Sequence, residues 1–432
     1  MGMPMGRRTF MGASAGLAAG LALSTGAEPA PARIGVIGTG NRGTHLLSIL
    51  VNLPEVEIRA VCDLKPEAAQ LAAEMVEKSS GKKPTMYTAG ELDYQNLLAR
   101  DDIDAVIIAT YWQWHTRMAV DAMKHGKYAG VEVPAALTFE ECQSLVDTYE
   151  QTKVPCMMLE NWSFRRDNLA LLNMKRKGLF GDIVHVHCAH SHNCIDHWFF
   201  DPEGNIRWGG EFLVNRNCDQ YPTHSQGPVL SWMDINCGDA YATISSVATE
   251  SRAINAYFAR KFGPDHPSAK RTYKQGDIVT STIRTQNGKT LIINYDMQLP
   301  RPYDNRWMLQ GLLGVYSEDR ESVYVEGRSP KYHEWEPFAP YQQEFDHAYW
   351  KSMSEKELAM GHGGTDVVEL KLFLKAVREK TQTPIDVYDS ATMSSIIPLS
   401  EASIAQGSKP IECPDYTKGA WKTRKPAFAL DV

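Results

Sequence analysis

The sequence lacks the patterns that most directly indicate metal, nucleic-acid or membrane binding. It has no Cys-x-x-Cys pair and no His-Glu-x-x-His segment, so a structural zinc site is not predicted and no metal ligand is assigned. It has no long basic run and a formal net charge of −7, which argues against nucleic acid as a partner. No apolar stretch is long enough for a stable membrane span. The remaining composition is that of a globular protein, whose 432 residues favour two domains.

The eight cysteines are too widely spread to indicate a disulfide framework. Cys62 and Cys156 lie in apolar runs typical of buried strands. We therefore expect mostly free, buried thiols.

The first 30 residues have the pattern of a twin-arginine export signal. Arg7 and Arg8 precede a short apolar stretch of small residues, and Ala27 lies near a plausible cleavage point. An N-terminal amphipathic helix is the alternative, but no polar face follows the arginines. The pattern predicts a protein of the periplasm or the cell exterior.

Strand and helix patterns alternate through residues 31–162. The apolar run at 32–38 has the length of a buried parallel strand, and similar runs recur at 56–63 and 104–110, separated by segments with helical periodicity. Such alternation predicts an α/β fold with a doubly wound parallel sheet, a Rossmann domain.

The rhythm changes in residues 163–432, where longer strand-like segments dominate. Segments at 183–192, 277–297 and 307–319 read as strands, and an Asn-Gly pair at 287–288 predicts a hairpin within the second. Helical patterns return at 366–380 and 389–407. We expect an α+β domain with a mixed or antiparallel sheet.

A glycine-rich loop directly after the first strand indicates a dinucleotide site. Gly38 suits a tight turn, Gly40 allows the backbone to approach a pyrophosphate, and Gly43 allows a helix to pack closely on the strand. Asp63 ends the next strand, where its carboxylate can accept a hydrogen bond from a ribose hydroxyl and would repel a 2′-phosphate. The pattern therefore predicts NAD rather than NADP as the cofactor.

The loop after the third main strand also reaches the predicted cofactor edge of the sheet. Trp112, Trp114 and His115 lie there and are candidates to enclose the nicotinamide half. The alternative is aromatic packing under a loop, with a helix-capping role for the histidine.

The segment after the next strand lacks a residue that sugar dehydrogenases of this kind use. Where those enzymes carry Glu-Lys-Pro, with lysine as the proton shuttle, this chain has Glu132, Val133 and Pro134. A dinucleotide enzyme without that lysine needs another acid or base.

Four further motifs, together with the glycine loop and the Glu132-Val133 pair, give the chain a clear resemblance to a known family. They are LENWSFRRD at 159–167, NRNCDQYPTH at 215–224, Arg-Pro-Tyr at 301–303 and Gly-His-Gly-Gly at 361–364. The chain resembles glycoside hydrolase family 109, the NAD-dependent glycosidases known for α-N-acetylgalactosaminidase activity, within the Gfo/Idh/MocA superfamily.

The resemblance implies a hydrolysis in which NAD ends as it began. The sugar is oxidised at C3, a base removes the C2 hydrogen, the C1 substituent leaves, water adds, and C3 is reduced again. Histidine and tyrosine suit the proton transfers. A carbohydrate is then the expected ligand, and a homo-oligomer paired through the sheet domains is a further expectation.

The resemblance also assigns site residues. The catalytic candidates are His224, His362 and Tyr303. Candidates to contact the sugar are Tyr221, Pro222, Thr223, His224, Tyr303 and His190. Candidates to contact NAD are Gly38, Thr39, Gly40, Asn41, Arg42, Gly43, Asp63, Trp112, Gln113, Trp114, His115, Glu132, Val133, Asn161 and Tyr221.

Three positions depart from the family pattern. His190 and Phe164 stand where tyrosines are usual, and Gly209 stands where an arginine follows tryptophan. Loss of polar partners alters a site that selects sugars by their hydroxyls, so the reaction type is better supported than the particular sugar.

Two other functions compete with hydrolysis. An ordinary NAD-dependent sugar dehydrogenase would release NADH, with His224 replacing the missing lysine as proton shuttle. A non-catalytic carbohydrate-binding protein would keep NAD only as a structural element.

Overall fold

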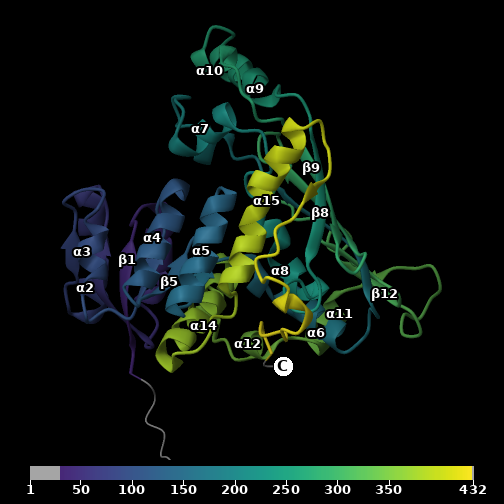
Figure 1. The fold of residues 1–432 in the computed structure, drawn as a ribbon, viewed down its shortest axis with the longest axis horizontal. Coiled ribbons are helices and arrows are strands. Elements are labelled where there is room, and N and C mark those ends of the chain that lie inside the picture. Colours follow the sequence, from purple (N-terminus) through teal and green to yellow (C-terminus); the bar gives the residue numbers. More distant parts are fainter. Residues whose placement is uncertain (1–29, 431–432) are drawn as a thin grey trace, which may run out of the picture.

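The computed structural model describes residues 30–430, which form two sheets side by side (Figure 1). Almost all of the predicted export signal lies outside the described residues. Within residues 30–430, no helix is both long and apolar enough to cross a membrane. All eight cysteines are described and are free thiols, six of them buried, which confirms the sequence prediction.

The first sheet has six parallel strands and is the predicted Rossmann domain. Its strand order is β3-β2-β1-β4-β5-β6. The strands are β1 (Ala32–Ile37), β2 (Val56–Cys62), β3 (Thr85–Tyr87), β4 (Ala105–Ile108), β5 (Tyr128–Val131) and β6 (Cys156–Met158). The connecting helices are α1 (Asn41–Leu50), α2 (Pro66–Ser80), α3 (Tyr94–Leu98), α4 (Trp112–Lys124) and α5 (Phe139–Thr152). The chain reverses its direction of travel across the sheet between β1 and β4, and a ligand crevice is expected at their carboxyl ends.

The second sheet has nine strands in the order β14-β13-β12-β11-β7-β10-β9-β8-β15. The strands are β7 (Ile183–Ser191), β8 (Tyr241–Ala248), β9 (Val279–Thr285), β10 (Thr290–Asp296), β11 (Met308–Gly311), β12 (Gly314–Ser317), β13 (Ser322–Val325), β14 (Glu336–Pro337) and β15 (Ile411–Glu412). β7 and β10 pair in parallel and the other neighbours are antiparallel, so the predicted mixed sheet is confirmed.

The single strand predicted at 307–319 is wrong in detail, because the segment forms two strands, β11 and β12. Gly311 packs so closely that a Cβ there would lie 2.1 Å from the carbonyl oxygen of Phe180. Leu312 and Leu313, which read as strand interior, form the exposed turn between the strands. The hairpin predicted at 287–288 is confirmed, with Gly288 at φ +85° between β9 and β10.

The helices that follow β6 in the chain carry much of the site. They are η1 (Asn161–Phe164), α6 (Arg166–Arg176), η2 (Ile195–Phe199), α7 (Trp208–Asn215), α8 (Thr223–Met233), α9 (Ala253–Phe262), α10 (Pro267–Lys270), α11 (Ala339–Glu344), α12 (Ala348–Lys351), α13 (Glu355–Leu358), η3 (His362–Gly364), α14 (Thr365–Glu379), α15 (Val387–Ala405) and η4 (Ala420–Lys422). Helix α8 was not predicted, because it is buried on nearly all sides and contains Pro228, so it has no amphipathic period.

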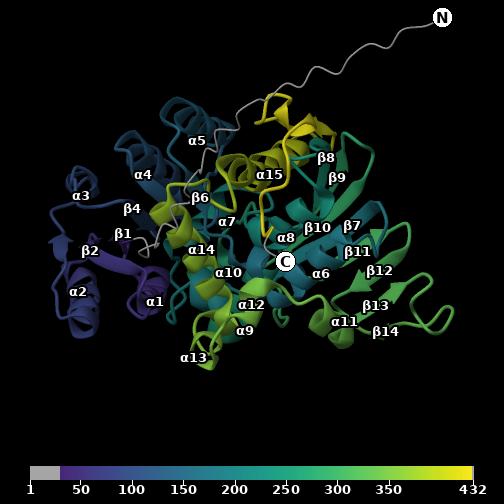
Figure 2. The same cartoon turned by 90° about the horizontal axis from the view of Figure 1, so that it is seen from below.

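The last two long helices bring distant sequence to the first sheet. α14 packs against α1, β1 and η1, whereas α15 packs against α5 and β6 on one side and β8 on the other. Figures 1 and 2 show α15 lying between the two sheets. This return of the chain brings Asp366, in its C-terminal third, to Arg42 of the glycine loop.

Candidate active site

The glycine loop between β1 and α1 has the close packing that the motif requires. Gly38 has φ +86°, and a Cβ there would lie 2.6 Å from the carbonyl oxygen of Ala109. A Cβ on Gly43 would lie 1.8 Å from the carbonyl oxygen of Gly38. In contrast, nothing lies within 4 Å of a Cβ built on Gly40, so this glycine leaves open space next to the backbone. Two glycines serve packing and the third leaves room for a ligand.

A cavity of about 540 Å³ opens beside this loop at the carboxyl edge of the sheet. The predicted cofactor residues that line it are Gly38, Gly40, Asn41, Arg42, Asp63 and Trp114. Thr39 lies beneath and donates its backbone N–H to Asp63 Oδ2 at 2.7 Å, whereas Asp63 Oδ1 accepts from the N–H of Lys65 at 2.9 Å. The loop therefore fixes the Asp63 carboxylate at the cavity wall. These features fit a dinucleotide.

The other predicted cofactor residues lie outside this cavity lining. Gln113 is exposed on α4, and the buried Trp112 ring packs against Trp198 and Tyr221 at centroid distances of 5.0 and 5.8 Å. His115 is buried, with Nδ1 2.8 Å from Pro134 O and Nε2 3.0 Å from Thr110 O. The Trp112 contacts agree with aromatic packing under the loop, but His115 does not cap α4, whose N-cap residue Tyr111 makes no side-chain hydrogen bond to the helix.

Arg42 joins the glycine loop to the C-terminal third of the chain. Its Nε donates to Glu132 Oε1 at 2.5 Å, and its Nη1 donates to Asp366 Oδ2 at 3.0 Å. Glu132 Oε2 also accepts from the N–H of the buried Val133 at 3.2 Å. Val133, at the position of the missing lysine, therefore packs in the core instead of presenting an ammonium to the site.

Asp366 collects polar groups from three segments. Its carboxylate oxygens lie 2.8 Å from His362 Nδ1 and 2.9 Å from His45 Nε2, and accept a hydrogen bond from Asn161 Nδ2 at 2.7 Å. Burial by itself would raise the pKa of Asp366, but these hydrogen bonds and the Arg42 charge hold it below its usual range. The guanidinium already supplies the cation, so this group is an ion-pair network rather than a metal site.

The predicted catalytic His224 is oriented by a carboxylate that sequence reasoning did not single out. His224 Nδ1 lies 2.6 Å from Oε1 of the fully buried Glu160. Glu160 Oε2 accepts from the N–H and the hydroxyl of Ser163 at 2.8 and 2.7 Å. A Cβ on Gly227 would lie 1.8 Å from Glu160 Oε2, so α8 can approach the carboxylate only with glycine there.

The aromatic side chains around His224 come from four segments. The Tyr221 hydroxyl lies 3.4 Å from His224 Nε2, and burial raises the pKa of Tyr221 well above its usual range. Trp162 donates its indole N–H to the Tyr303 hydroxyl, and its ring lies 5.7 Å from His224 and 5.4 Å from His362. Trp162 thus connects all three predicted catalytic residues, although it was not predicted.

His190, one of the departures from the family pattern, lies within the same cluster. Its ring is 4.8, 5.5 and 5.4 Å from those of Tyr221, His224 and Tyr303. It is buried, and its Nδ1 has no hydrogen-bond partner among the described residues. Burial, together with the neighbouring His224, lowers the pKa of His190 well below its usual range. A neutral imidazole therefore offers one ring nitrogen as donor and the other as acceptor.

The remaining sugar-contact candidates and departures are largely buried. Pro222 and Thr223 begin α8 beneath His224, and the Thr223 hydroxyl has no hydrogen-bond partner among the described residues. Phe164 lies in the core against Phe428. Gly209 lies against Trp198, which lines the cofactor cavity.

Sequence reasoning could have found some of the missed residues. Glu160 and Trp162 follow β6 at the carboxyl edge of the parallel sheet, where functional side chains gather. Asp366 had no such signal, because only the packing of α14 brings it to the glycine loop.

Comparison with known proteins gives a family match for the Rossmann domain and another for the C-terminal domain. The family model for the oxidoreductase family with an NAD-binding Rossmann fold matches residues 32–160, and that for the glycosyl hydrolase 109 C-terminal domain matches residues 164–423. A glycosyl hydrolase family 109 protein of Stenotrophomonas maltophilia is 39% identical over 99% of each chain. An α-N-acetylgalactosaminidase of Tannerella forsythia is 39% identical over 92% of this chain and 89% of its own.

Among solved structures, levoglucosan dehydrogenase in complex with NADH is similar in fold. Its TM-score is 0.68, at 19% identity, covering 89% of this chain and all of that one.

The fold and the site thus define a protein of the NAD-binding Rossmann oxidoreductase superfamily, with a second domain that places histidines and tyrosines near the cofactor edge. Within that class, the chain belongs to glycosyl hydrolase family 109 and is an NAD-dependent glycosidase.

Proposed function

We propose that the protein hydrolyses an α-linked N-acetylgalactosaminide or a closely related glycoside without net oxidation. The main support is the Glu160–His224 pair, which lies among Tyr221, Tyr303 and His190. This pair provides a base in a chain that lacks the lysine used as proton shuttle by the sugar dehydrogenases with Glu-Lys-Pro. The name of the Tannerella forsythia relative supports the choice of sugar.

The glycine loop and its cavity are the proposed NAD site. Gly40 leaves the space that a pyrophosphate needs, the N-terminus of α1 offers unpaired N–H groups, and Asp63 is positioned for a ribose hydroxyl. NAD bound there supplies reversible hydride transfer at the sugar.

His224 is the proposed base. Because Glu160 accepts a hydrogen bond from Nδ1–H, the Nε2 lone pair faces the Tyr221 hydroxyl and the open side of the cluster. This arrangement lets His224 take a proton from a sugar hydroxyl or from the carbon next to an oxidised centre. Its tautomer is set by a buried carboxylate, so the orientation does not depend on solvent.

Tyr303 and His362, which both contact Trp162, are proposed to complete the proton transfers. Trp162 fixes the Tyr303 hydroxyl by its indole N–H, and burial raises the pKa of Tyr303 so that it stays a neutral donor. His362 lies in a glycine-flanked turn, is held by Asp366, and lies against the same indole ring. It is placed to protonate a leaving group.

The experiment that tests this function uses purified protein, aryl glycosides of α- and β-linked sugars including N-acetylgalactosamine, and no added NAD. Aglycone release without accumulation of NADH supports the proposal. Substrate-dependent NADH in solution would instead support the dehydrogenase alternative, and no turnover on any glycoside would favour a binding protein. With a substrate that carries deuterium at C2, loss of this label from the product would support removal of the C2 hydrogen during the reaction.

The export signal and the homo-oligomer are also proposals. Replacing Arg7 and Arg8 with lysine in the full chain is expected to leave the protein in the cytoplasm of a host that has the twin-arginine pathway. Unchanged export would refute the signal. A molar mass equal to that of the monomer, measured on the exported protein by sedimentation equilibrium, would refute the homo-oligomer.

A further inference from the structure

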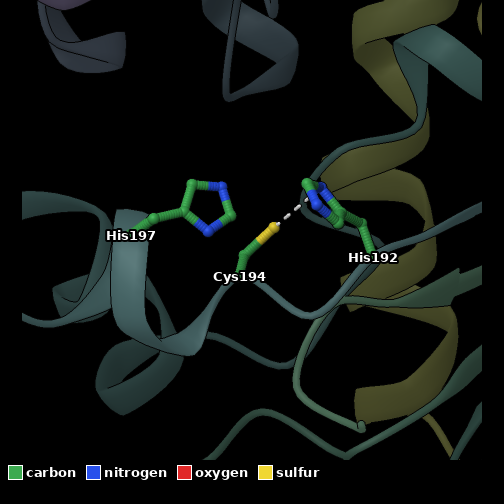
Figure 3. Close-up of side chains that lie close together, drawn as sticks. All are labelled: His192, Cys194 and His197. Atoms are coloured by element: carbon green, nitrogen blue, oxygen red, sulfur yellow. Dashed lines mark hydrogen bonds between the residues drawn. The ribbon is translucent and has the colours of Figure 1, made fainter. Parts of the chain in front are cut away.

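Three potential metal ligands lie together in six residues beyond the end of β7. His192, Cys194 and His197 form a His-x-Cys-x-x-His segment that runs into the π-helical turn η2. Their ligand atoms all lie within 4.8 Å of one another. Figure 3 shows the two imidazoles on opposite sides of the Cys194 sulfur, which points into the space between them.

The backbone of this segment is fixed before any ligand binds. The N–H of His192 donates to Asp296 O at 2.8 Å, and the N–H of Cys194 donates to Met297 O at 3.0 Å. Cys194 Sγ already lies 3.4 Å from His192 Nδ1, and the His192 and His197 ring centroids are 5.1 Å apart. Because these hydrogen bonds already hold the backbone, less conformational entropy is lost when a metal ion binds.

Among the described residues, two charged side chains next to the cluster form their hydrogen bonds with other groups. Asp196 is engaged by Tyr257 and Lys261, and Arg207 donates to the carbonyl oxygen of His197 rather than to its ring. This distinguishes the group from His45, His362 and Asp366, where Arg42 is already the cation.

We propose that His192, Cys194 and His197 bind one Zn²⁺ ion and leave its fourth coordination position open. One sulfur and two imidazole nitrogens match the ligand preference of Zn²⁺, with bonds of about 2.0–2.3 Å. Binding converts the Cys194 thiol to a thiolate and releases one proton to solvent, while the imidazoles bind as neutral donors. His197 is exposed and can rotate toward the other two ligands at small cost.

The cluster borders both Tyr303 of the proposed sugar site and the proposed cofactor cavity. The His192 ring centroid lies 5.2 Å from that of Tyr303, and His197 lines the same cavity as the glycine loop. The fourth ligand expected at the open coordination position is a water molecule or a hydroxyl oxygen of the carbohydrate. The carbohydrate ligand rests on the proposed function, whereas metal binding by the three side chains does not.

Metal binding to the full chain, freed of metal by dialysis but still carrying its dinucleotide, tests the proposal. Zn²⁺ is titrated and the bound metal is counted by elemental analysis; Co²⁺ serves as a spectroscopic probe for thiolate ligation. We expect about one equivalent of Zn²⁺ and a Co²⁺–thiolate charge-transfer band, with affinity reduced at least 10-fold in Cys194→Ser and in His197→Ala.

Matched controls keep the result interpretable. Cys237→Ser and His333→Ala remove a half-buried cysteine and an exposed histidine outside the cluster, and should bind Zn²⁺ like the wild type. Because Cys194 is buried, His197→Ala at an exposed position tests the site without disturbing the core. The proposal is overturned if the wild type binds no more Zn²⁺ than Cys194→Ser and His197→Ala, the two variants within the cluster. Turnover is not measured, so failure of the glycosidase proposal would leave this outcome unaffected.

Discussion

Glu160 Oε1 lies 2.6 Å from His224 Nδ1, and the carboxylate that makes this contact is fully buried. A buried carboxylate beside an imidazole fixes both its tautomer and its orientation. The relationship gives His224 a defined basic nitrogen, and the chemistry proposed for the protein depends on it.

Replacing Glu160 by glutamine tests this relationship. Glu160→Gln keeps the size of the side chain but replaces the carboxylate that accepts the hydrogen bond from His224 Nδ1–H. We expect the rate of aglycone release to fall by about 10²-fold or more, and its pH profile to change, because general-base catalysis contributes on this scale. Bound NAD should be unchanged. Exposed Glu140→Gln is the control, and wild-type rates in Glu160→Gln would contradict the role of the pair.

Trp162→Phe isolates the hydrogen bond to Tyr303. The aromatic ring between His224 and His362 is kept, but the indole donor is lost. A hydrogen bond is worth about 0.5–1.5 kcal/mol net, so kcat/KM should fall by up to about 10-fold, with little change in thermal stability. The partly exposed Trp335→Phe gives the comparison. A loss no greater than in that control would show that Trp162 acts only by packing.

The glycine loop predicts opposite outcomes for two alanine substitutions. Gly43→Ala would place a Cβ 1.8 Å from the carbonyl oxygen of Gly38, so we expect poor folding even without cofactor. Gly40→Ala meets no atom within 4 Å, so the fold should persist while NAD binding weakens. Circular dichroism and NAD released on denaturation measure both effects. If Gly40→Ala retained as much NAD as the wild type, the pyrophosphate could not lie against the backbone at Gly40.

Asp219 predicts a pH-dependent loss of stability. Burial raises the pKa of Asp219 from 3.8 to about 7, so folding favours its neutral form. That contribution is fully present below pH 3.8 and is lost as the pH rises through about 7. Asp219→Asn should therefore be more stable than the wild type at pH 8, by up to about 4 kcal/mol at 1.36 kcal/mol per pKa unit, with a smaller difference at pH 5.

Urea unfolding at the two pH values measures this difference. Asp265→Asn, at an exposed position, is the control and should show no pH-dependent gain. An Asp219→Asn advantage that is equal at pH 5 and pH 8 would exclude titration of Asp219 as its cause.

Local patterns were sufficient for the parallel sheet and its glycine loop. Buried parallel strands are continuous apolar runs, and the loop depends on glycines whose lack of a side chain is itself the signal, as Gly38 and Gly43 demonstrate. Helix α8 could not be predicted in the same way, since burial on nearly all sides removes its periodicity.

The sequence by itself determined the Rossmann domain, the family and the residue types available for chemistry. Only the tertiary structure decided that Glu160 orients His224, that Trp162 joins Tyr303 to His362, and that Asp366 pairs with Arg42. The physical reason is sequence separation. Arg42 and Asp366 are 324 residues apart, and no local propensity records a contact that depends on how α14 packs against α1 and β1.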